Sequence, residues 1–228
     1  MLALAGLLGA GVSAADFAPI EASEATGWRF VGLPKLPRTR IDAVEFDGSR
    51  ALRVESQAGY GQWVHDFMPP VPPPGPLVWE WRLERRNDAA DLRQRAGDDT
   101  SLKVCALFAM PDERVPFGER LLLQLARARS AEPLPAATLC YVWDARLPAG
   151  TLLPNAYSAR VRYLVAEDAA TPLATWRMQR RDLGADFLRA FGDESKTVPP
   201  LMAIAVGADA DNTGAASLGH LRGLRWAP

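Results

Sequence analysis

Short runs of apolar residues, alternating with polar ones and separated by turn residues, recur along most of the chain. Residues 77–83 show the pattern well: Trp79 and Trp81 share one face with two leucines, and Glu80 and Arg82 lie between them. Side chains two positions apart share a face of a strand, so this alternation predicts a strand with one face in the core. Similar runs predict strands at residues 28–33, 41–46, 51–55, 62–67, 102–110, 138–144, 158–166, 174–180, 201–208 and 220–226.

Two segments have helical spacing instead. In residues 117–129 the leucines at 121, 122 and 125 fall on one side and arginines on the other, which predicts a short amphipathic helix. Residues 182–191 predict a second helix, with Asp182 as its N-cap and Gly192 at its C-terminal end.

The order of these elements indicates the fold class. No β-α-β alternation is present, so we expect a mainly β protein, an antiparallel β-sandwich of jelly-roll type with two short helices. Residues 69–76 hold six prolines. Because proline cannot donate to a sheet ladder, we expect this stretch to be an extended crossover outside the sheets. Residues 15–228 are then one β-sandwich domain, a normal size for this class.

The first residues predict export. Residues 2–12 are apolar and small, and Val12 and Ala14 supply the small side chains of a cleavage site. We therefore expect a signal peptide at residues 1–14, cleaved after Ala14, and a periplasmic or extracellular protein. The alternative is a buried N-terminal helix. The run is too short for a transmembrane segment, which needs ~20 apolar residues.

Charge and cysteine content narrow the partners. The formal net charge of −1 gives no electrostatic reason to expect nucleic acid. Cys105 and Cys140 could pair in an oxidising compartment or serve as two small buried apolar residues. With only His65 and His220, the chain shows no zinc pattern and no Ser/His/Asp or Cys/His catalytic arrangement.

Six motifs occur in order along the chain. They are Trp79-Glu80-Trp81-Arg82, Gly97-Asp98-Asp99, Leu139-Cys140-Tyr141-Val142-Trp143, Trp176 with Arg180-Arg181-Asp182, Ala185-Asp186-Phe187 with Phe191-Gly192, and Asp209-Ala210-Asp211-Asn212-Thr213. In these motifs the chain resembles a bacterial family known as domain of unknown function 3047. The resemblance implies an exported, β-rich protein and carries no activity.

The acidic turn after residue 207 is the first candidate site. Asp209, Asp211 and Thr213 place oxygen atoms at alternate positions before Gly214, as at the start of a calcium loop. His220 stands where the closing glutamate of an EF-hand would be, and strands flank the turn, so an EF-hand is excluded. We predict a metal site at Asp209 and Asp211, with calcium as the ion. The alternative is a turn held by Asx hydrogen bonds.

The second candidate is Gly97-Asp98-Asp99, at the start of a strand. Either aspartate could meet the acidic turn across the end of a sheet, and carboxylates at glycosidase distances could then catalyse hydrolysis. Alternatively, one of them accepts hydrogen bonds from backbone amides or pairs with Arg93 or Arg95. We predict Asp98, Asp99 and Asn212 as ligand-binding residues.

Trp143 completes the predicted site. It precedes Asp144 and a turn-rich loop, and we expect it to be the exposed aromatic on which a sugar ring could stack, although a half-buried packing role is the alternative.

Three functions fit these residues. The one we favour is non-catalytic binding of a glycan or similar polar ligand, or of a component of the cell envelope, with structural calcium near the acidic turn. The second is a glycoside hydrolase or polysaccharide lyase that uses the carboxylates named above. The third is a structural envelope protein without a small ligand.

Overall fold

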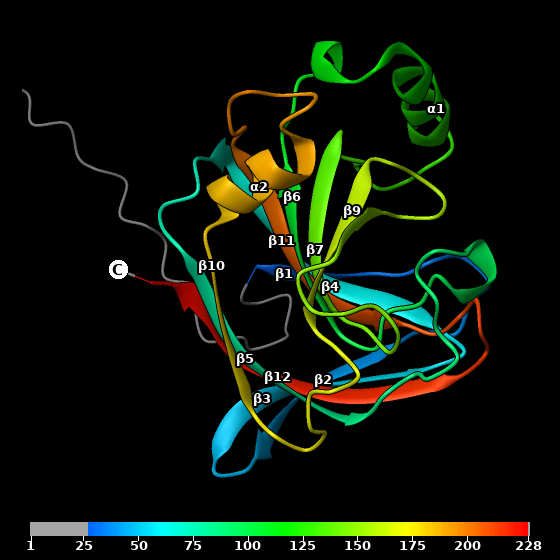
Figure 1. Ribbon diagram of the computed structural model, residues 1–228, viewed down its shortest axis with the longest axis vertical. Coiled ribbons are helices and arrows are strands. Elements are labelled where there is room, and N and C mark those ends of the chain that lie inside the picture. The colour runs from blue at the N-terminus through cyan, green and yellow to red at the C-terminus, as the bar shows by residue number, and fades with distance from the viewer. Residues whose placement is uncertain (1–26, 228) are drawn as a thin grey trace, which may run out of the picture.

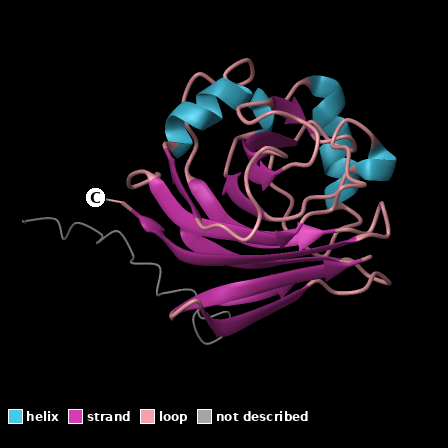
Figure 2. Cartoon of the chain, turned by 60° about the horizontal axis from the view of Figure 1, so that its bottom comes forward, coloured by secondary structure: helices cyan, strands magenta, loops and turns pink. Residues whose placement is uncertain are grey.

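The computed structural model describes residues 27–227, in which strands form two sheets and two α-helices lie apart from each other toward the same end of the molecule (Figures 1 and 2). The predicted signal peptide at residues 1–14 lies outside the described residues. The order of the seven-stranded sheet is β1 (Trp28–Val31), β4 (Tyr60–Val71), β11 (Leu201–Asp209), β6 (Lys103–Phe108), β7 (Ala137–Trp143), β9 (Val161–Glu167), β8 (Leu152–Pro154). The order of the five-stranded sheet is β10 (Arg177–Arg181), β5 (Leu77–Arg85), β12 (Ala216–Trp226), β3 (Ser49–Gln57), β2 (Arg40–Phe46).

The main core lies between the two sheets. The ring centroid of Trp79 on β5 lies 5.4 Å from that of Tyr141 on β7, and Trp81 and Trp143 are 5.9 Å apart. All four side chains are buried. Aromatic pairs at these distances contribute packing beyond their buried area, so β5 and β7 are joined by the largest side chains of the core.

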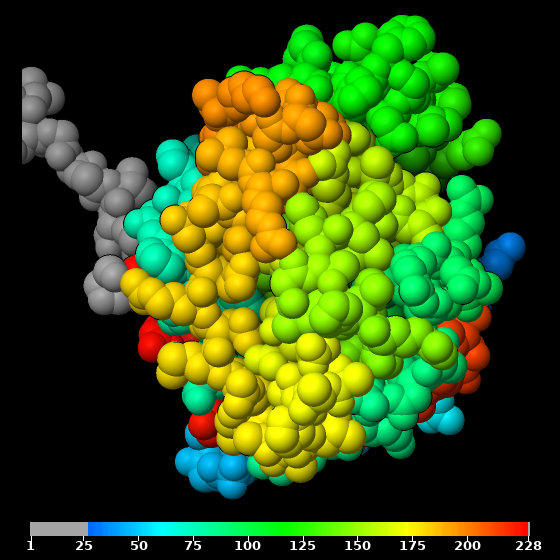
Figure 3. Space-filling model, in the orientation of Figure 1, coloured from blue at the N-terminus to red at the C-terminus, as the bar shows by residue number. Residues whose placement is uncertain are grey.

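The helices differ in how they pack. The Asp182 carboxylate accepts hydrogen bonds from two backbone amides in the first turn of α2 (Leu183–Phe191), as predicted. α2 buries Phe187 and Phe191 in the core. By contrast, α1 (Phe117–Arg127) lies at the periphery of the molecule and buries only Leu123 (Figures 1 and 3).

The mainly β, sandwich-like fold is confirmed, with one difference in how its strands pair. β7 and β9 pair in parallel, so the seven-stranded sheet is mixed rather than fully antiparallel. The jelly-roll connectivity stays a prediction.

The start of the proline-rich stretch is also inside a sheet. β4 continues to Val71, which pairs with Leu201 of β11, so the prediction that this segment cannot pair was wrong. The described pairing with β1 ends at His65, and beyond it β4 has β11 on one side only. An edge position tolerates proline because no neighbour needs the missing N–H.

The outer face of the seven-stranded sheet, turned away from the five-stranded one, carries a second apolar cluster. Cys105 on β6 and Cys140 on β7 are direct neighbours in the ladder and form a disulfide on this face. The open question of their pairing is thereby answered. Among the described residues, no helix is long and apolar enough to cross a membrane.

Candidate functional site

Asp99 binds the acidic turn at residues 209–213 through its carboxylate. Its carboxylate accepts hydrogen bonds from the backbone N–H groups of Asn212 (3.1 Å) and Thr213 (2.8 Å) and from the Thr213 hydroxyl (2.5 Å). The Asn87 side-chain amide donates a further one at 3.4 Å. A buried carboxylate surrounded by donors in this way holds two distant segments together. The role of Asp99 is therefore to fix the turn.

Asp209 pairs with a buried lysine. Lys103 Nζ lies 2.9 Å from one carboxylate oxygen, and the Thr100 backbone N–H donates to the other at 2.6 Å. The Lys103 ammonium also lies 5.0 Å from the centre of the Tyr60 ring. Burial lowers the pKa of Lys103, but the charge and the hydrogen bond of Asp209 outweigh it, and the net pKa is raised. Lys103 therefore stays charged and neutralises Asp209.

Asp98 is a carboxyl that can hold a proton near neutral pH. The Tyr163 hydroxyl donates to it at 3.1 Å, and the Asn155 side-chain amide donates to its other oxygen. Burial, helped by the Asp209 charge, raises the pKa of Asp98 to about 6, against the opposing effect of these two donors and of Lys103. Asp98 can thus act as a donor or an acceptor within the physiological pH range.

Asp211 has a carboxylate oxygen without a partner. Its Oδ1 atom is buried and has no hydrogen-bond partner among the described residues. Burial raises the pKa of Asp211, and the charges of Asp209 and Asp99 add to the shift. A buried acceptor without a donor costs free energy, so a rotation of the side chain that brings this oxygen to a donor is favoured.

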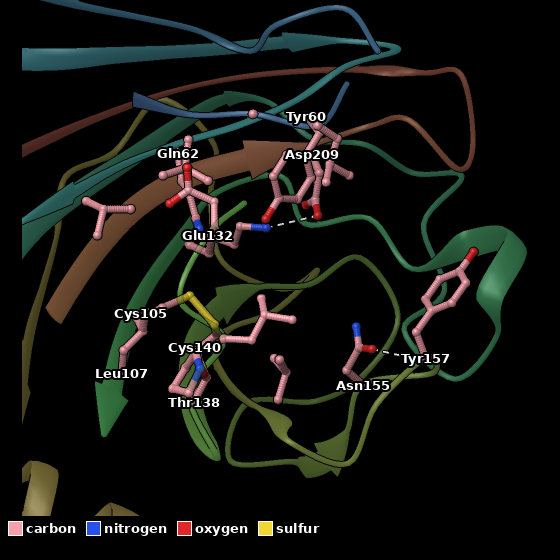
Figure 4. A pocket seen from close by; sticks show the side chains of 18 of the residues that line it. Tyr60, Gln62, Cys105, Leu107, Glu132, Thr138, Cys140, Asn155, Tyr157 and Asp209 are labelled. Atoms are coloured by element: carbon pink, nitrogen blue, oxygen red, sulfur yellow. Dashed lines mark hydrogen bonds and ion pairs between the residues drawn. A yellow bond between two sulfur atoms is a disulfide. The ribbon is translucent and has the colours of Figure 1, made fainter. Parts of the chain in front are cut away.

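These groups line one end of a pocket on the outer face of the seven-stranded sheet, with a volume of about 460 Å³. Figure 4 shows Tyr60 and Asp209 on one side of the disulfide and Leu107 and Thr138 on the other. We call the side with Asp98, Asp209, Asp211 and Asn212 the polar end. The volume falls in the range of ~300–1,000 Å³ that is usual for small-molecule sites.

Tyr157 forms the rim of the polar end. Its hydroxyl oxygen lies 2.8 Å from the Asn212 side-chain oxygen and 3.1 Å from the Arg95 carbonyl oxygen, and its single proton is shared between these two acceptors. The Asn212 side-chain amide in turn donates to the Asp98 carbonyl at 3.1 Å. The residue is 55% exposed, so part of its ring is open to a ligand.

The model of the DUF3047 family, described as a protein of unknown function, matches residues 26–225. The chain belongs to the DUF3047 family. This confirms the resemblance found in the six motifs. No curated protein matches the chain.

In this DUF3047 chain the two predicted acidic segments do meet. Gly97-Asp98-Asp99 lies against the turn at residues 209–213 through the hydrogen bonds described above. Asp98, Asp209, Asp211 and Asn212 line the pocket, whereas Asp99 lies behind it as a structural residue. Arg93 pairs with Asp91 rather than with either predicted aspartate.

Trp143 does not belong to the site. It is only 1% exposed and packs against Trp81 in the main core, so the prediction of an exposed aromatic was wrong. All seven residues of β7 are buried, and a strand covered on both faces gives no polar–apolar contrast to show which side chains point outward.

The sequence reasoning missed several site residues. Lys103, Tyr60, Asn155 and Tyr163 all line the pocket. Lys103 had a usable signal, since it is a charged residue at the start of a run of otherwise apolar residues. Tyr60 and Asn155 had none, because only the sheet order brings them to Asp98 and Asp209.

The calcium prediction for Asp209 and Asp211 stays a prediction. Within residues 27–227 no group of three or more His, Cys, Asp or Glu side chains is arranged to hold a metal ion. Lys103 also stands beside Asp209 where a cation would be, and so removes the electrostatic demand for one.

Proposed function

We propose that this DUF3047 chain binds a glycan or similarly polar ligand, without catalysis, at the polar end of the pocket. The observation that carries the proposal is a pocket of suitable size whose polar end is lined by Asp98, Asp211 and Lys103. A ligand hydroxyl could donate to the Asp211 carboxylate, whose Oδ1 has no partner in the described part of the chain, once the side chain turns this buried oxygen toward the pocket.

The neighbouring groups match hydroxyls in particular. A hydroxyl both donates and accepts, and the polar end offers both kinds of partner within a short distance. Asp211 accepts, Lys103 donates, and Asp98 can do either because its pKa is about 6. The half-exposed ring of Tyr157 at the rim adds a surface for the C–H face of a sugar.

Export belongs to the same proposal. A disulfide between adjacent strands persists in an oxidising compartment, which supports a periplasmic or extracellular location. The glycan would then be a component of the cell envelope or of the surroundings.

Calorimetric titration with maltose, cellobiose, galactose and N-acetylglucosamine tests the binding function. We expect at least one sugar to bind, and Asp211→Ala to weaken that binding roughly tenfold through the loss of one hydrogen bond to a charged group. Asp193→Ala is the matched control, because this aspartate is exposed and does not line the pocket. Equal affinities for the wild type and Asp211→Ala would remove the polar end from the binding site.

One observation favours a second candidate, glycoside hydrolysis. Asp98, with a pKa of about 6, could protonate a leaving group, and Asp211 lines the same pocket as a second carboxylate. Release of nitrophenol from 4-nitrophenyl glycosides measures it. Turnover that is lost in Asp98→Asn while the sugar still binds would favour the enzyme, and no turnover with the wild type would favour the binder.

A further inference from the structure

The pocket changes character along its length. On β6, Lys103, Cys105 and Leu107 all face outward and line the pocket in this order. Alternate residues of a strand lie ~7 Å apart, so these three side chains cover about 13 Å from the polar end to the far end. Along that path the lining changes from an ammonium group, through a disulfide, to a leucine.

The strand β4 repeats this gradient. On β4, Tyr60, Gln62 and Val64 line the pocket, and the register of β4 and β6 on β11 places Gln62 level with Lys103 and Val64 level with Cys105. β9 contributes an apolar residue at the far end: Val161 lies level with Thr138, which pairs with Leu107 of β6. β4 and β6 therefore run from polar to apolar in the same direction, while Thr138 of β7 is a polar side chain at the far end.

At the far end of the pocket, the charged side chains are already held in ion pairs. Leu134 lines the pocket, and it also lies near Phe108, the neighbour of Leu107 in sequence. The Arg29 guanidinium pairs with Glu132 at 2.5 Å and with Asp66 at 2.5 Å. Both carboxylates hold the Arg29 guanidinium, so it is not free for a ligand, and the three groups together carry a net charge of −1 at the margin of the chamber. The other side chains of the adjoining chamber are mainly apolar. We call the chamber formed by Val64, Leu107, Leu134, Val161 and the disulfide the apolar end.

We propose that the ligand is amphipathic, with a sugar headgroup at the polar end and a hydrocarbon chain in the apolar end. This inference rests on the proposed function and names its ligand class: an alkyl or acyl glycoside, or a glycolipid. A second sugar in the apolar end would exchange its hydrogen bonds with water for contacts with valine, leucine and sulfur, which is unfavourable. A hydrocarbon chain gains from the same contacts.

Calorimetric titration with methyl, butyl, hexyl and octyl β-D-glucoside, each below its micellar concentration, tests the inference. We expect the affinity to rise about three- to fourfold for each methylene group that becomes buried. Asp211→Asn changes the headgroup site only, so it should weaken all four glucosides by the same factor and leave the dependence on chain length intact.

Leu107→Gln probes the apolar end. It should flatten the dependence on chain length, whereas Leu188→Gln on the exposed surface of α2 should leave it unchanged. Val161→Thr, a nearly isosteric change at the same end, is the second variant if Leu107→Gln does not fold. Val161→Thr should also weaken the dependence of affinity on chain length.

The outcomes separate the two proposals. Equal binding of methyl and octyl glucoside would overturn the amphipathic ligand and leave sugar binding in place. Octanol binding as tightly as octyl glucoside would show that the headgroup is not recognised, and would overturn the proposed function. Binding of none of these probes would overturn both.

Discussion

The two faces of the seven-stranded sheet are built from the same strands but serve different purposes. On the inner face, Tyr141 and Trp143 pack against the tryptophans of β5 and are fully buried. On the outer face, Lys103, Cys105 and Leu107 line a pocket. Successive residues of a strand therefore alternate between stabilising the sandwich and shaping the site.

Asp98 and Asp99 repeat this contrast within one dipeptide. Asp99 accepts hydrogen bonds from the acidic turn and fixes it, while Asp98 faces the pocket with a raised pKa. Neighbouring carboxylates point in different directions in an extended chain, so one can hold the structure while the other remains available to a ligand.

The largest expected effect is on the inner face. Trp143→Ala should lower the free energy of unfolding by about 4 kcal/mol, because it opens a large cavity against Trp81. Tyr157→Ala, at the pocket rim, should cost less than about 1 kcal/mol, because the ring is half exposed. Urea unfolding of both variants measures the difference, and similar losses would contradict the division into a core face and a pocket face.

Removal of the disulfide should have the next largest effect. Cys105 and Cys140 are 35 residues apart in sequence, and the double replacement with serine should cost about 3 kcal/mol by releasing this loop in the unfolded chain. Thermal unfolding of the double variant and of the reduced wild type should agree. A stability unchanged by either treatment would show that the outer face does not depend on the disulfide.

The pH dependence of stability sharpens the contrast between Asp98 and Asp99. Burial raises the pKa of Asp98 from 3.8 to about 6, so the folded protein holds this proton more tightly than the unfolded chain does. The contribution of Asp98 to stability is complete below about pH 4 and falls by about 2 to 3 kcal/mol as the pH rises through 6.

Asp98→Asn should remove that part of the pH dependence. The free energy of unfolding of variant and wild type should be measured between pH 4 and pH 7. The stability of the variant relative to the wild type should rise over this range and be highest at pH 7. Curves that remain parallel would mean that Asp98 titrates normally.

Calcium should have the smallest effect. Because Lys103 neutralises Asp209, we expect millimolar calcium or EDTA to leave the melting temperature unchanged. An increase with calcium that disappears in Asp211→Asn would instead establish the metal site predicted from the sequence.

Alternation in the sequence was sufficient to predict most of the strands, and the burial of Trp79 and Trp81, because β5 has one core face and one more polar face. It failed at Trp143, because β7 is buried on both faces. The pairing of Cys105 with Cys140 and the position of Tyr60 near Asp209 depend on which strands are neighbours and in what register. Local pattern does not contain that information.

The two acidic segments, residues 97–99 and 209–213, were predicted in part. Their residue types indicated a polar site, and the structure shows that they meet. Asp98 and Asp99 have different roles because the fold brings different hydrogen-bond donors to each. Residues 155 and 163 donate to Asp98, and residues 87 and 212–213 donate to Asp99.

A crystal structure of the protein with octyl β-D-glucoside tests the central claim most directly. The outer-face pocket should hold the ligand, with the sugar hydroxyls within hydrogen-bond distance of Asp211 and Asp98 and the alkyl chain lying along the disulfide toward Leu107. A ligand bound elsewhere on the surface, or bound in the pocket with its chain toward Asp211, would contradict the account.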